Sequence, residues 1–171
     1  KTGYGKLPYM WRQIIAGLLF GIVTCMATEF GLQIPGAVLN IRDAAPLCAG
    51  LLFGGPAGVI SGFLGGVYRL FWGTSFANTF TAEWLTTMFA VDAAGGFTRI
   101  ACTLGTVCSG IFGALMRKTL FDNKRPTWGY GIVIALTTEV FHLFLVFVFR
   151  LNYLERVYSV IKACSLPMIA A

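Results

Sequence analysis

The sequence predicts an all-α integral membrane protein, a polytopic bundle of five to six transmembrane helices with a Gly-Pro break near Pro56. Of the 171 residues, 57% are hydrophobic and 12% are charged, whereas about 25% of residues are charged in ordinary soluble domains. The apolar residues form long uncharged runs, and about 20 helical residues are enough to cross the hydrocarbon core. Because lipid offers the backbone no hydrogen-bond partners, runs without strand-like alternation must be helices.

Apolar stretches place the expected helices along the chain. The first covers about residues 13–28 and is not a signal peptide, because it is as long as a span and lacks a small-residue cleavage site. The later helices cover about residues 44–68, 97–116 and 129–149, and a last helix begins near Val157. Since the chain begins at Lys1 and closes on a mostly apolar stretch, we expect it to be cut from a longer protein.

Positive charges set the predicted topology. Basic residues cluster before the first helix and in one short polar loop, namely Lys1, Lys6 and Arg12, then Arg117, Lys118, Lys124 and Arg125. By the positive-inside rule, both clusters and therefore the N-terminus lie in the cytoplasm. An even number of crossings must separate them, so the segment from about residue 44 to 91 begins and ends on the outer side.

Two arrangements of residues 44–70 satisfy this topology. In the first, the segment is one continuous span and residues 71–91 form another. A glycine every four residues favours this form, since it gives one face for close packing: Gly50, Gly54, Gly58, Gly62 and Gly66. In the second, the segment breaks at Gly54-Gly55-Pro56 into two short helices, because Pro56 lacks a backbone donor and clashes with the carbonyl four residues earlier.

The arginines favour the broken form. Arg42 and Arg69 flank the segment, and a straight helix would separate them by about 40 Å at 1.5 Å per residue. Side by side on the outer face, their planar guanidinium groups would form a fork for a small carboxylate. The alternative interpretation pairs Arg42 with Asp43 at the interface and directs Arg69 to the lipid headgroups. Arg99 is expected to face the interface.

Three other ionisable residues lie in or near apolar stretches. Glu139 and His142 are three residues apart on one helix, so they share a face and are expected to be able to bond to each other. Glu29, near the outer end of the first helix, is placed to balance one of the arginines. Ionisable groups at membrane depth are functional candidates, but none of these three is assigned to the site.

No nucleophile-and-base pair, phosphate loop or metal cluster stands out, so we expect neither enzymatic activity nor a cofactor or metal in this segment. The five cysteines are odd in number and scattered, which fits neither a disulfide framework nor a zinc site. The formal net charge of +6 is explained by topology and headgroup contact. Nucleic acid is therefore not an expected partner.

Four short motifs give the chain a family resemblance. They are Asn40-Ile41-Arg42, Gly54-Gly55-Pro56-Ala57-Gly58, Gly66-Val67-Tyr68-Arg69 and Gly95-Gly96-Phe97-Thr98-Arg99-Ile100-Ala101-Cys102. With these motifs, residues 12–171 resemble the five-transmembrane sensor domain of LytS/YhcK-type receptors. The resemblance implies one transmembrane sensor domain over residues 1–171 in the bacterial cytoplasmic membrane, truncated before a cytoplasmic histidine kinase or diguanylate cyclase domain.

The resemblance also implies a ligand site. Arg42 and Arg69 would grip a small carboxylate such as pyruvate from the outer side, and Cys102 would line the pocket. Asn40 and Thr106 complete the expected ligand-binding set. The expected partners are this small anion, the lipid bilayer and a second copy of the chain in a homodimer.

Two features depart from the family pattern. Residues 70–94 intervene before Gly95, where the family has only a few residues, and this insertion is expected to form an extra outer helix or a lid. Gly105 stands three residues after Cys102, where carboxylate-sensing members often carry a serine. Both departures leave room for a different or larger ligand.

An alternative resemblance is to the substrate-binding components of energy-coupling-factor vitamin transporters, which are about this length and bind substrate from outside. Such a component needs small residues on its first helix to dock its transport partner. Gly17, Gly21 and Cys25 provide a stripe at four-residue spacing. The Asn-x-Arg and Tyr-Arg motifs favour the receptor instead.

Overall fold

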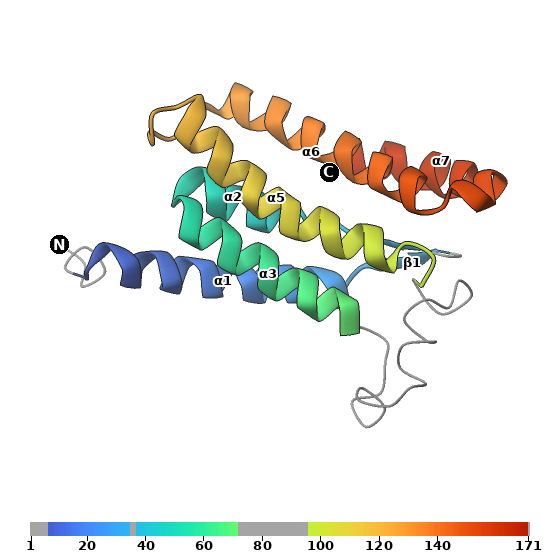
Figure 1. Ribbon diagram of the computed structural model, residues 1–171, viewed down its shortest axis with the longest axis horizontal. Helices are drawn as coiled ribbons and strands as arrows, with labels where there is room; N and C mark the ends of the chain where they lie inside the picture. Colours follow the sequence, from blue (N-terminus) through green and yellow to red (C-terminus); the bar gives the residue numbers. More distant parts are fainter. Residues whose placement is uncertain (1–6, 35–36, 72–95, 171) are drawn as a thin grey trace.

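The computed structural model describes residues 7–34, 37–71 and 96–170 of the chain (Figure 1). Within these ranges the backbone forms a bundle of six α-helices, with one short 3-10 helix and one two-stranded hairpin. Three of the helices are long and apolar enough to cross a membrane, namely α1 (Tyr9–Glu29), α5 (Arg99–Thr119) and α6 (Trp128–Phe149). The predicted helical membrane bundle is therefore confirmed.

The segment after the hairpin is broken into two helices, as favoured from the arginines. The first, α2 (Ala44–Leu52), is followed by α3 (Gly55–Phe71), and the two pack against each other (Figure 1). Gly54 between them has a φ of +126°, a conformation that only glycine adopts readily. Pro56 is tolerated because it falls in the first turn of α3, where no helical carbonyl awaits its missing donor.

A side chain from α1 closes this break. The Gln13 side-chain amide donates to the Phe53 carbonyl over 2.7 Å, and its oxygen accepts from the Ala57 backbone N–H over 3.3 Å. Gln13 is buried. Broken helix ends carry unpaired backbone groups that lipid cannot satisfy, so this amide supplies partners that the bilayer lacks.

The glycine stripe serves both halves of the broken segment. A Cβ added to Gly58 would lie 2.4 Å from the Gly110 carbonyl oxygen, and one added to Gly50 would lie 2.5 Å from the Ala114 nitrogen. Both distances are shorter than any real contact, so α2, α3 and α5 meet backbone to backbone. The expectation that the stripe marks one continuous helix face was wrong, because the same spacing also suits two helices packed on a third.

The small residues of α1 are used inside the chain. A Cβ on Gly17 would lie 2.8 Å from Ile60 Cβ, and one on Gly21 would lie 2.7 Å from Leu64 Cδ1. The α1 glycines are therefore covered by α3 (Figure 1). This observation removes the feature that supported a docking surface for a transport partner.

A short hairpin between α1 and α2 was not anticipated. Strands β1 (Leu32–Ile34) and β2 (Ala37–Leu39) pair antiparallel, with Leu32 opposite Leu39. Strands of three residues are too short to show a two-residue alternation that a sequence reading would detect. The hairpin carries the chain from the end of α1 to Arg42, just before α2.

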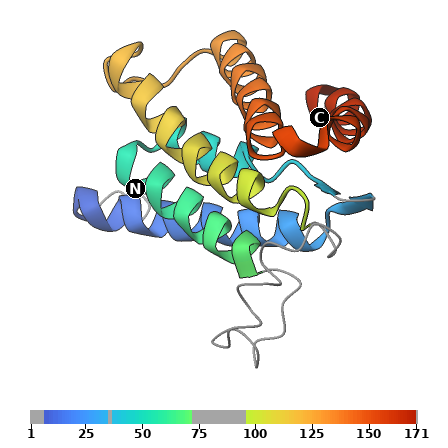
Figure 2. The same ribbon diagram turned by 45° about the vertical axis from the view of Figure 1, so that its right-hand side comes forward.

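The last two long helices, α6 and α7 (Leu154–Ala170), lie side by side along one flank of the bundle (Figure 2). Between them, after the 3-10 helix η3 (Leu151–Tyr153), the chain turns back. Arg150 in this connection donates to the Phe97 carbonyl over 2.7 Å and so ties it to the start of α5. The expected extra helix or lid at residues 70–94 lies almost wholly outside the described residues.

Candidate functional site

Three arginines are buried where helix ends meet. Arg42 precedes α2, Arg69 lies in the last turn of α3 and Arg99 begins α5, and each is no more than 1% exposed. Arg69 is within electrostatic range of both of the others. A guanidinium group at membrane depth costs several kcal/mol unless it is paired, so a cluster of three requires negative partners.

Part of that requirement is met by the polar groups around Arg42. Its Nε donates to Thr106 Oγ1 over 2.7 Å and lies 3.5 Å from Asp43 Oδ1, while its backbone N–H donates to the Asn40 side chain. The Thr106 hydroxyl is also 2.6 Å from Asp43 Oδ1. Arg42 Nη1 has no hydrogen-bond partner among the described residues. The guanidinium group is thus held on one side and left available at Nη1.

Cys102 lies beside these arginines at the end of a chain of polar contacts. Its sulfur is 3.3 Å from His142 Nε2, and His142 Nδ1 is 2.6 Å from Asp43 Oδ2. All three side chains are buried. A thiol, an imidazole and an orienting carboxylate in this order are the components that activate a cysteine in nucleophilic catalysis. The same contacts join α5 and α6 to the residue before α2.

The residues predicted for the site are brought together. Arg42, Thr106 and Cys102 are linked directly, since Arg42 Nη2 donates to the Cys102 carbonyl. Arg69 interacts electrostatically with Cys102, and Asn40 holds the backbone of Arg42. The predicted convergence of Arg42 and Arg69 is confirmed, while the role of these residues in ligand binding stays a prediction.

Comparison with known proteins supplies the family. A family model described as the 5TMR of 5TMR-LYT matches residues 5–91 and again residues 84–171. The chain belongs to this family of five-transmembrane LytS-type sensors. It is therefore a membrane sensor domain of the kind that sensor histidine kinases carry.

Two curated relatives illustrate that kinship. The sensor histidine kinase BtsS of Escherichia coli K12 is 26% identical over 130 residues, which cover 76% of this chain and 19% of BtsS. The sensor histidine kinase YpdA of the same organism is 22% identical over 151 residues, covering 88% of this chain and 23% of YpdA. The chain thus spans about a fifth of each relative. No solved structure matches it.

The sequence analysis did not assign two residues to the candidate site that the structure places there, namely Asp43 and His142. Asp43 had been read only as an interfacial partner of Arg42, and His142 was expected to bond to Glu139. Instead, the two ring nitrogens of His142 face Asp43 and Cys102. The available signal was that the chain's single histidine lies within an apolar helix.

Two further expectations about charged residues were wrong. Arg99 does not face the interface, because it is 1% exposed. Glu29 accepts a hydrogen bond from the Tyr68 hydroxyl at an exposed position, so its observed partner is a tyrosine and not an arginine. Both errors arose from judging a charged residue by its place along a helix, without the rotation that decides which way it faces.

Gly105 is explained by its neighbour on α6. A Cβ added to Gly105 would lie 3.1 Å from both Cγ and Cδ2 of the His142 ring. The serine expected at this position from the family resemblance would therefore press against the imidazole, which occupies the space.

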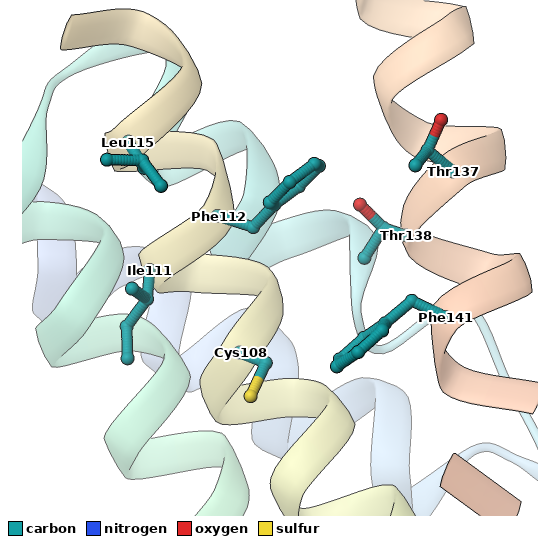
Figure 3. A pocket seen from close by; sticks show the side chains of 7 residues that line it. All are labelled: Cys108, Ile111, Phe112, Leu115, Thr137, Thr138 and Phe141. Carbon is teal, nitrogen blue, oxygen red and sulfur yellow. The ribbon is translucent and has the colours of Figure 1, made fainter. Parts of the chain in front are cut away.

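A separate cavity of about 310 Å³ lies between α5 and α6 (Figure 3). Its lining carries no charged side chain and consists of Cys108, Ile111, Phe112, Leu115, Thr137, Thr138 and Phe141. Ile111, Leu115 and Phe141 are each more than 40% exposed on the lipid-facing surface. This cavity therefore offers no charged group to bind an anion.

Proposed function

We propose that this sensor domain binds a small carboxylate from the outer side of the bacterial cytoplasmic membrane through Arg42 and Arg69. The observation that carries the proposal is the burial of two arginines from different helix ends around one cysteine. Planar guanidinium groups match carboxylate oxygens two to two. A carboxylate between them would offset the like-charge repulsion that the bundle otherwise bears.

The proposed signal is a change in helix packing. Arg42 and Arg69 belong to the two ends of the α2–α3 unit, and Cys102 belongs to α5. Through Cys102, the site contacts His142 on α6, which leads on to α7. A ligand shifts such an equilibrium only by binding one arrangement more tightly, so the carboxylate must favour the form in which these helix ends are drawn together.

The output that this change would reach is taken from the relatives. BtsS and YpdA are sensor histidine kinases, so we propose a cytoplasmic kinase domain as the receiver, with the domain acting as a homodimer. The basic clusters at the N-terminus and between α5 and α6 would face the cytoplasm. In this orientation the hairpin and the arginine cluster would lie near the outer surface.

A thermal-shift screen of the purified chain tests the ligand class. Wild type should be stabilised by members of a carboxylate panel that includes pyruvate, because a ligand that binds only the folded state raises its apparent stability. Arg69→Gln should lose the shift, whereas Arg125→Gln, exposed in the loop between α5 and α6, should keep it. Stabilisation by a vitamin panel alone would contradict the proposal and support a transport component.

A further inference from the structure

The third arginine of the cluster is not used by the proposed carboxylate fork. Arg99 is 1% exposed, and its Nε and Nη1 have no hydrogen-bond partner among the described residues. The hydroxyl of Thr98, the preceding residue, is likewise buried and without such a partner. Buried polar groups in native proteins are nearly always hydrogen-bonded. Two adjacent exceptions at one helix end therefore point to a missing partner that accepts hydrogen bonds.

The charges of the cluster give the sign of that partner. Three arginines are buried here, and the described carboxylates within electrostatic range of the cluster are Asp43 and, on α6, Glu139. Cys102 and His142 share a contact, and moving a proton from the thiol to the imidazole does not change the balance. The arginines therefore outnumber the carboxylates, and a monocarboxylate held by Arg42 and Arg69 would leave Arg99 without an anionic partner.

We propose that Arg99 and Thr98 form a second anion subsite, and that the preferred ligand is a small dicarboxylate bridging it to the Arg42 and Arg69 pair. This inference rests on the proposed function and names its substrate class. Arg99 is three residues before Cys102 on α5, so the two side chains lie on the same side of the helix, one turn apart. Arg69 also lies within electrostatic range of Arg99 and of Cys102, so the second subsite belongs to the same buried cluster as the first.

Calorimetric titration of the purified chain tests this subsite, with malonate and succinate as dicarboxylates and acetate and propionate as their monocarboxylate counterparts. Hydrogen bonds to charged groups are worth about 1.5–3 kcal/mol, so wild type should bind a dicarboxylate at least about tenfold more tightly. Arg99→Gln should abolish this preference while leaving monocarboxylate affinity within about threefold. Arg125→Gln is the matched control at an exposed arginine.

The outcomes separate this inference from the proposed function. An unchanged dicarboxylate preference in Arg99→Gln would overturn the subsite, even where monocarboxylate binding still depends on Arg42 and Arg69. Absence of dicarboxylate binding to wild type would overturn the subsite alone, whereas absence of binding by every member of the carboxylate panel, pyruvate included, would sink both proposals. If Arg99→Gln fails to fold, Thr98→Val and Arg99→Lys keep the test open, because each should weaken dicarboxylate binding more than monocarboxylate binding.

Discussion

The Cys102 thiol has two kinds of neighbour, and each constrains what it does. On one side, the arginines provide positive charge; on the other, His142 Nε2 lies 3.3 Å from the sulfur. Asp43 Oδ2 lies 2.6 Å from Nδ1 of the imidazole, so the carboxylate and the thiol face opposite nitrogens of the ring. The imidazole therefore links the Cys102 sulfur to Asp43, the residue next to Arg42.

Gly105 gives the most local prediction. Gly105→Ser should destabilise the protein by about 1–3 kcal/mol, because the new side chain overlaps the His142 ring and overpacking a filled site costs that much. Thermal unfolding in detergent measures the effect. In a His142→Ala background, Gly105→Ser should lose little further stability, because the overlap is gone. If the double variant instead loses as much stability as the sum of the two single variants, the contact does not matter.

At the scale of elements, the broken helix depends on Gln13. Gln13→Leu should cost about 1–3 kcal/mol of folding free energy, since it leaves the Phe53 carbonyl and the Ala57 N–H buried without partners. Gln13→Glu, when protonated, keeps a carbonyl acceptor for Ala57 and an O–H donor for Phe53, and should lie closer to wild type than Gln13→Leu. Wild-type melting temperature in Gln13→Leu would contradict the role given to this amide.

Local sequence alone did not decide between one span and two helices. Pro56 indicated a stop by its backbone chemistry, but the break was favoured because it brings Arg42 and Arg69 together. The spacing of Gly50 and Gly58 identified a close-packed face but not its partner, because α5 supplies Gly110 from far along the chain. The β1–β2 hairpin was too short to leave a pattern.

At the scale of the whole molecule, the candidate site lies where the ends of several helices meet. Residues before α2, at the end of α3, at the start of α5 and within α6 contribute to one buried cluster. Arg42, Arg69 and Cys102 could be predicted because each belongs to a short motif. His142 and Arg99 could not be placed, since nothing local fixes how far α6 and α5 rotate about their axes. The packing of the bundle decides that rotation.

The central claim is that Arg42 and Arg69 together bind the ligand's carboxylate. Its most direct test is calorimetric titration of wild type, Arg42→Gln, Arg69→Gln and Arg125→Gln with the carboxylate that stabilises wild type most. Loss of a charged hydrogen-bond partner predicts at least about a tenfold loss of affinity in each of the first two variants, with Arg125→Gln unchanged. Wild-type affinity in folded Arg42→Gln and Arg69→Gln would contradict the account.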